Sequence, residues 1–250
     1  MEKKKTGSSR YYFLFIFTVA LIIAGYSGFR SVITKISLFE IDVIKITGNI
    51  NLETEFLYNL SKDFIGQNLY AISKKDVLHK YENIVRIQDI KVTRIMPNKL
   101  RIKIIEKQGI FYIKTIEGEL FPIDKNRIVL DNDNFYSDEI LPTIETRIPA
   151  SELTFGKKIK NEFVERVFDL HNTIISEDPD FINHISEFYE FDKDIYMIEA
   201  NTGYRIVFGN NEIEDKLKKF TFLEQNRTFE KDTIVDLRFN NQLVIRSEVR

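Results

Sequence analysis

The sequence predicts an α+β protein that begins with a transmembrane helix and continues with two folded units. The first observation is an uncharged, mostly apolar run over residues 11–29. The second is the order strand, helix, helix, strand, strand (β-α-α-β-β) over residues 39–108, which is typical of a compact α+β unit. The third is a strand-rich pattern with two helical stripes over residues 109–250, which indicates a mixed, mostly antiparallel β domain with flanking helices.

The N-terminus predicts a single-pass membrane protein of type II orientation. The run over residues 11–29 would span about 28 Å as a helix, close to the hydrocarbon thickness of a bilayer. Four cations lie within residues 1–10, whereas only Arg30 and Lys35 follow soon after the run. This asymmetry predicts a cytoplasmic tail over residues 1–10, a connector over residues 30–38, and a periplasmic or extracytoplasmic location for the rest. The protein would then reside in the inner, or cytoplasmic, membrane. A cleaved signal peptide is the alternative, because small residues lie near Ala24.

The first folded unit is predicted from its periodicity. Residues 41–46 are rich in branched side chains and indicate a strand. Apolar residues recur every four positions over residues 52–64, which indicates one face of a helix. A capping-box pattern at Ser73 predicts a second helix. Two alternating segments, 90–94 and 100–104, predict a β-hairpin.

The second unit is predicted to contain strands joined by short loops, with two helices. The first helix is expected from Gly156 to near Pro179 and the second over residues 212–225. The expected strands cover residues 110–116, 120–130, 185–191, 195–200, 204–208, 233–239 and 242–247.

Composition and motifs argue against catalysis and nucleic-acid binding. The 250 residues are 43% hydrophobic and 30% charged, and the net charge of −2 provides no positive field for nucleic acid. The absence of cysteine excludes disulfides and thiolate metal sites. The three histidines, His79, His171 and His184, lack metal-ligand spacing, and no nucleotide-binding or nucleophile motif is present. We therefore expect no catalytic residue, cofactor, metal site or small-molecule substrate.

The predicted hairpin is strongly basic. It could present a charged sheet face to acidic lipid or to an acidic partner, or the face could simply be solvated. The cations concerned are Arg86, Lys91, Arg94, Lys99, Arg101 and Lys103.

Short motifs along the chain resemble the FtsQ/DivIB family of bacterial cell-division proteins, which are single-pass membrane proteins with a POTRA domain. The residues that carry the resemblance are Gly48, Asn49, Gly66, Asn68, Leu69, Arg94, Pro97, Leu100, Glu106, Leu141, Pro142, Asp236, Leu237 and Arg238. Most of these have a plain structural explanation, such as a turn for Gly48 or pairing on one strand face for Asp236 and Arg238. Residues 123–126 depart from the family, which tends to place a glycine two residues after the aspartate.

The resemblance implies a non-catalytic scaffold that recruits bitopic division proteins of the FtsB/FtsL kind at the septum. The last predicted strand is a natural edge strand, whose unpaired N–H and C=O groups can pair with another chain. The expected partner-binding residues are Phe239, Asn241, Leu243, Val244 and Ile245. A POTRA-type factor for envelope or outer-membrane protein assembly is the alternative, although the sequence shows no run of barrel strands. A membrane-anchored envelope enzyme is less favoured still.

Overall fold

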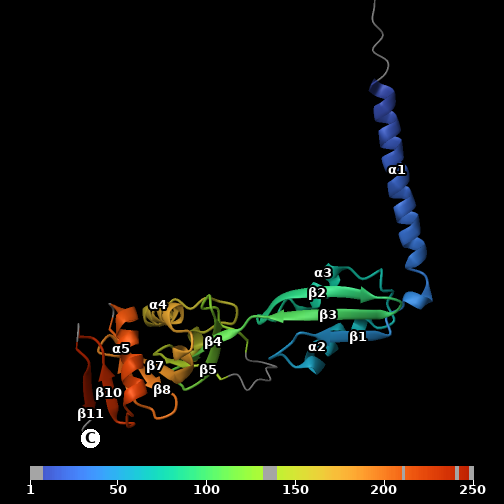
Figure 1. The fold of residues 1–250 in the computed structure, drawn as a ribbon. Helices are drawn as coiled ribbons and strands as arrows, with labels where there is room; N and C mark the ends of the chain where they lie inside the picture. The colour runs from blue at the N-terminus through green and yellow to red at the C-terminus, as the bar shows by residue number, and fades with distance from the viewer. Residues whose placement is uncertain (1–7, 132–139, 210–211, 240–241, 248–250) are drawn as a thin grey trace, which may run out of the picture. The chain divides into compact units, whose positions relative to one another are not determined.

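The computed structural model describes the backbone of residues 8–131, 140–209, 212–239 and 242–247. The chain divides into two compact units, Met1–Glu106 and Lys107–Arg250 (Figure 1). Both units combine helices with β-sheet, so the predicted α+β class is confirmed.

Helix α1 (Ser8–Ile33) contains the uncharged run of the sequence. Its large apolar side chains between residues 11 and 23 are exposed, and Phe13 retains 75% of its accessible surface. Among the residues that the structure describes, no helix has the length and hydropathy expected of a membrane span. The anchor over residues 11–29 stays a prediction.

The rest of the first unit is a three-stranded sheet with two short helices. After a 3₁₀ turn (Ser37–Phe39), its elements are β1 (Val43–Thr47), α2 (Thr54–Ser61), a 3₁₀ turn (Lys62–Phe64), α3 (Lys74–Tyr81), β2 (Ile87–Ile95) and β3 (Lys99–Glu106). The sheet order is β1-β3-β2, with β1 parallel and β2 antiparallel to β3. The predicted β-α-α-β-β order is therefore confirmed. The capping box at Ser73 is also present, since Ser73 and Asp76 exchange side-chain and backbone hydrogen bonds.

One face of this sheet forms the core of the first unit. Ile90, Leu100 and Ile102 point inward and pack with Leu57 of α2 and Val77 of α3. All five side chains are at most 1% exposed. Burial of each contributes roughly 1.5–3 kcal/mol, which is how a unit of this size gains its stability.

The second unit is built on an eight-stranded sheet. Its strands are β4 (Gly109–Lys114), β5 (Leu120–Asp124), β6 (Thr143–Glu145), β7 (Ile185–Phe191), β8 (Asp194–Glu199), β9 (Arg205–Val207), β10 (Thr233–Asp236) and β11 (Val244–Ser247). The order is β11-β10-β9-β8-β7-β6-β4-β5. Described strand pairs are antiparallel for β4–β5, β7–β8, β8–β9 and β10–β11. They are parallel for β4–β6, β6–β7 and β9–β10.

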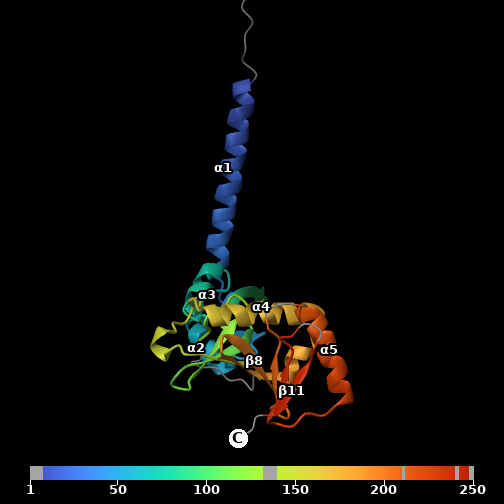
Figure 2. The same cartoon turned by 90° about the vertical axis from the view of Figure 1, so that its left-hand side faces the viewer.

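Helices α4 (Glu162–Glu177) and α5 (Ile213–Asn226) lie beside this sheet and share its core (Figure 2). The expected start of the first helix at Gly156 is wrong, because the Asn161 side chain accepts from Val164 N and caps the helix there. The expected strand over residues 120–130 ends at Asp124, because the chain turns at Arg127, where φ is 65°.

Candidate partner-binding site

A buried carboxylate closes the first unit. Glu106, at the end of β3, is 6% exposed. Its Oε1 accepts from Ile50 N at 2.8 Å and Leu52 N at 3.2 Å, and its Oε2 accepts from Asn51 N at 3.0 Å. Three backbone N–H groups thus surround one negative charge, which fixes the loop between β1 and α2.

The start of that loop needs a glycine. Gly48 has φ of 81°, and an added Cβ would lie 2.6 Å from the carbonyl oxygen of Ile104. Asn49 donates from Nδ2 to Leu52 O and to Thr54 Oγ1, both at 2.8 Å. Gly48 and Asn49 therefore shape a turn, as their sequence pattern predicted.

A second motif joins the rest of the first unit to the end of α1. Gly66 also has a positive φ, of 79°, and Leu69 is fully buried. Between them, Asn68 donates from Nδ2 to the carbonyl oxygens of Ile33 and Ile36, both at 3.1 Å. The carbonyl groups at the end of α1 are thereby partly satisfied.

The hairpin motif forms hydrogen bonds with the segment that follows Asn68. Arg94 donates from Nε to Leu69 O at 2.8 Å and from Nη2 to Ile72 O at 2.7 Å. Leu100 is 1% exposed and Pro97 lies in the turn between β2 and β3. Arg86 is fully buried. Placing Arg86 on the basic, partly exposed face was therefore wrong, because its side chain is buried. Arg94 is exposed and donates to two backbone carbonyl groups.

An ion network lies at the end of β10. Asp236 is 0% exposed and accepts from Arg238 Nη2 at 2.6 Å and Nε at 2.9 Å. Arg246 of β11 donates from Nη2 to the same carboxylate at 2.6 Å. Arg238 also donates from Nη1 to Asp194 Oδ2 at 2.6 Å. Two arginines and two aspartates thus tie the last strand to the preceding one and to β8.

The charge on Asp236 is maintained by its partners. Burial disfavours the charged carboxylate, but the hydrogen bonds and charge of Arg238, together with the charge of Arg246, outweigh it. The pKa of Asp236 is consequently below its ordinary value. Hydrogen bonds to Asp236 and Asp194 raise the pKa of Arg238.

Beside this network lies an open sheet edge. Strand β11 pairs with β10 and is the outermost described strand on that side. Phe239 is 50% exposed, whereas Leu243 and Ile245 pack partly against the core and Val244 is half-buried. Asn241 lies outside the described residues. Four of the five predicted binding residues therefore lie on or next to the same edge.

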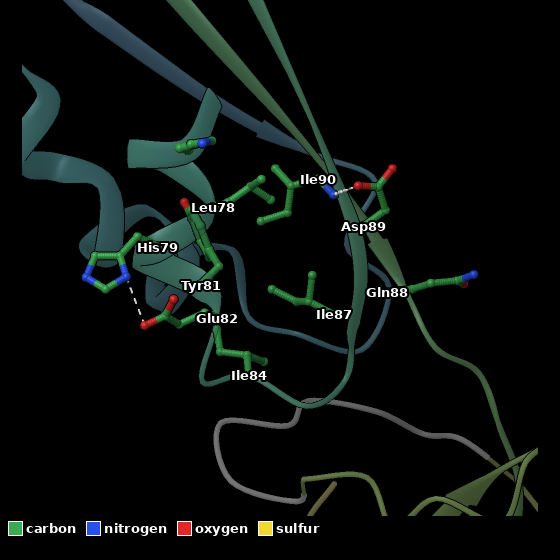
Figure 3. Close-up of a pocket in the computed structure, with 10 residues that line it drawn as sticks. Leu78, His79, Tyr81, Glu82, Ile84, Ile87, Gln88, Asp89 and Ile90 are labelled. Atoms are coloured by element: carbon green, nitrogen blue, oxygen red, sulfur yellow. Dashed lines mark hydrogen bonds and ion pairs between the residues drawn. The ribbon is translucent and has the colours of Figure 1, made fainter. Parts of the chain in front are cut away.

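A second edge, at β2 in the first unit, borders a groove (Figure 3). The groove has a volume of ≈ 470 Å³ and is lined by α3, the first half of β2 and the loop between them, with Leu78, Ile84 and Ile87 among its apolar side chains. At its margin, Asp89 Oδ1 accepts from Ile90 N at 2.8 Å and lies 3.9 Å from Lys74 Nζ. This edge is thus partly occupied by the chain's own carboxylate, unlike β11.

Comparison with known proteins identifies the first unit. Residues 39–107 match the FtsQ-type POTRA domain. The chain is 30% identical over 131 residues to the cell division protein DivIB of Clostridium botulinum (strain Hall), covering 52% of this chain and 48% of that protein. It is 21% identical over 248 residues to the cell division protein FtsQ of Acinetobacter oleivorans, covering 98% of this chain and 81% of that protein. Residues 39–107 are thus an FtsQ-type POTRA domain, and the chain is similar to the cell division proteins of the FtsQ/DivIB family.

The match to the DivIB proteins is partial. It spans about half the length of the two Clostridium botulinum relatives, 48% in each case. A third relative, DivIB of Clostridium acetobutylicum, is 31% identical over 101 residues, which is 39% of either chain.

Side-chain contacts hold the turn in which the sequence departs from the FtsQ/DivIB pattern. In the turn after β5, Asp124 Oδ1 accepts from Asn126 N at 2.8 Å and from Ile128 N at 2.9 Å. The left-handed residue of this turn is Arg127, whose guanidinium lies 2.7 Å from Glu165 of α4. The ion pair helps to hold a conformation that a glycine would adopt without strain.

Sequence reasoning missed two members of the ion network, Asp194 and Arg246. Arg246 falls within the strand expected over residues 242–247, and Asp194 lies 44 positions from its partner Arg238. No local spacing pattern marks either residue.

Proposed function

We propose that this protein is a non-catalytic, membrane-anchored scaffold of the bacterial division complex. It recruits bitopic division proteins of the FtsB/FtsL kind at the septum. The observation that carries the proposal is the open edge of β11, next to the half-exposed ring of Phe239. The names of the relatives, cell division proteins DivIB and FtsQ, support the division role.

The partner adds a strand to β11. Unpaired backbone groups of an edge strand supply affinity, and flanking apolar side chains supply selectivity. Phe239 is the anchor, because exposed aromatic residues dominate interface energies. Val244, Leu243 and Ile245 lie on or beside the strand that would receive the partner. The ion network of Asp236 holds β11 in register, so recognition depends on a preformed edge.

The edge is tested with two neighbouring prolines. Successive residues of a strand direct their N–H groups to opposite sides, so Val244→Pro and Ile245→Pro remove one donor toward β10 and one toward the open edge. We expect the variant that loses the N–H group on the open edge to keep its unfolding midpoint and to lose the co-purified bitopic partner. Phe239→Ala should lower co-purification about tenfold without unfolding the domain. Normal recruitment by the folded proline variant would reject the edge mechanism.

The anchor is the topological part of the proposal. Residues 11–29 carry no charge, the tail is basic, and the apolar side chains of α1 between residues 11 and 23 are exposed, as expected of a helix that meets lipid. The bulk of the chain then lies outside the cytoplasm.

Protease added to spheroplasts tests this topology. It should degrade the chain beyond Arg30 and leave a membrane-bound N-terminal fragment. A cytoplasmic protein should remain intact as the control. A soluble product that begins near Gly28 would show signal cleavage and would remove the anchor from the proposal.

A further inference from the structure

The outer face of the POTRA sheet concentrates positive charge. The strand register places Lys45 opposite Arg101, and Lys91 opposite Lys103. Like charges directly opposite each other on a sheet are destabilising, so this arrangement has a folding cost that an anionic surface would relieve. Lys99 extends the row, and we call these five exposed cations the basic face.

The basic face has no internal counter-charge within the described part of the chain. None of its five cations takes part in an ion pair with a described residue. The acids just before β1 and on β2 have other partners. Asp89 lies beside Lys74, and Asp42 accepts a hydrogen bond from Asn98 at 3.4 Å.

One end of this sheet is apolar and exposed. Leu38 is 62% exposed, Met96 65% and Ile65 40%. Backbone hydrogen bonds bring their segments together, from Leu69 N to Phe39 O, from Asp42 N to Asn98 O and from Gly66 N to Ile41 O. We call these three exposed side chains the apolar rim.

The apolar rim lies where α1 ends. Asn68, within the rim's segments, holds the carbonyl oxygens of Ile33 and Ile36. The basic face begins at the same end, because Lys99 directly follows the turn that contains Met96. Apolar side chains next to a helix end, followed by cations, match the order of layers at a membrane surface, where hydrocarbon gives way to headgroups.

We propose that the POTRA domain docks on the membrane around its own anchor. The apolar rim enters the interface, and the basic face binds the phosphodiester headgroups of anionic lipids. Each cation near an anionic surface contributes roughly fivefold to binding. Docking in this way fixes the orientation of the POTRA domain at the membrane. The inference rests on the proposed anchor and is independent of partner binding at β11.

The absence of native cysteine allows a clean test. The full chain is reconstituted in vesicles whose lipids carry a headgroup quencher, with one fluorophore at Thr93→Cys on the basic face. The control label is Glu55→Cys on α2, since the helices cover the opposite face of the sheet. Vesicles contain phosphatidylcholine alone, or phosphatidylcholine mixed with phosphatidylglycerol. Flotation of the chain with the vesicles reports separately on the anchor.

We expect phosphatidylglycerol to increase quenching of the Thr93 label several times and to leave the Glu55 label unchanged. The double variants K45E/R101E and K91E/K103E change only exposed side chains, and each should abolish the increase. Equal quenching at both labels, no effect of phosphatidylglycerol, or unchanged quenching in both variants would overturn the proposal. An acidic protein that binds the face while the label stays unquenched would also overturn it. A chain that fails to float would overturn both the anchor and the docking, but not partner binding at β11.

Discussion

Each unit of this protein buries one carboxylate of the family motifs, and hydrogen-bond donors of two different kinds stabilise the two carboxylates. Glu106 accepts hydrogen bonds from three backbone N–H groups, whereas Asp236 accepts hydrogen bonds from two guanidinium groups. Backbone donors are neutral and belong to a loop, so they order local structure. Guanidinium donors are charged and belong to long side chains, so they join strands. The same chemical group therefore closes a turn in one unit and fastens an edge strand in the other.

The comparison assumes that each unit has a core of its own, and Leu100→Asp tests this assumption with the largest effect. Leu100 is 1% exposed, and a buried unpaired carboxylate should cost the POTRA domain more than about 4 kcal/mol. Residues 36–108 should unfold cooperatively in urea, and the variant should be unfolded without denaturant. Lys99→Asp, at the exposed neighbouring position, should stay folded. A folded L100D variant, or no cooperative transition in the parent segment, would show that the unit is misassigned.

Asp236→Asn tests the charged carboxylate. It leaves two guanidinium groups facing a neutral amide. We expect the free energy of unfolding of the second unit, measured as its own transition in the full chain, to fall by about 3 kcal/mol. Because the pKa of Asp236 is lowered on folding, its contribution is present above the unfolded value near 3.9 and is lost as pH falls through the folded value. Urea unfolding at a series of pH values should therefore show that the stabilities of the parent and the D236N variant converge in acid. Asp194→Asn, at a partly exposed position, should cost less.

Glu106→Gln tests the carboxylate held by backbone donors. A glutamine oxygen can keep the bonds from Ile50 and Leu52, while its amide faces the N–H of Asn51. We expect a loss of about 1–2 kcal/mol, which is smaller than for Asp236→Asn. The measurement is urea unfolding of the POTRA domain. Glu82→Gln, in an exposed pair with His79, should change stability little. An effect of Glu106→Gln as large as that of Asp236→Asn would erase the proposed difference.

Local patterns predicted much of the fold and little of these two sites. Alternation around Pro97 gave the hairpin, and the capping box at Ser73 gave α3, because both depend on neighbouring residues. The three-residue strand β6 was missed, since so short a segment carries no periodicity. The partners of Glu106 lie 54 to 56 positions away, and only the folded chain brings them together.

The same limit explains the one wrong assignment of charge. Arg86 reads as part of a basic hairpin, yet it is fully buried, whereas Lys91 and Arg101 are exposed as expected. Sequence alternation gives the face of a residue within a strand, and Arg86 lies just before β2 begins. Its burial follows from tertiary packing, which no local pattern encodes.

The smallest expected effect concerns a buried side chain. It has neither the backbone N–H donors of Glu106 nor the guanidinium donors of Asp236. His171 of α4 is 7% exposed and stacks edge-on with Phe111, and its Nδ1 has no hydrogen-bond partner among the described residues. Burial lowers the pKa of His171, while a hydrogen bond with Asn172 opposes this shift. The unfolded chain then binds a proton near pH 6.5, whereas the folded chain binds it only at lower pH. Stability from neutral His171 is therefore complete above about pH 6.5 and declines as pH falls toward the folded value.

We expect the parent chain to lose stability as pH falls from roughly 7.5 to 5.5, because protonation of the unfolded histidine then favours unfolding. His171→Leu removes the titrating group and should flatten the profile over this interval, whatever its own packing cost. His79→Leu changes an exposed histidine in the other unit and should leave the slope of the second transition unchanged. The readout is the urea midpoint of that transition at several pH values. A steeper loss in H171L than in the parent would show that His171 gains, rather than loses, from protonation. The difference between His171 and Asp236 could then not be explained by the lack of a charged partner at His171.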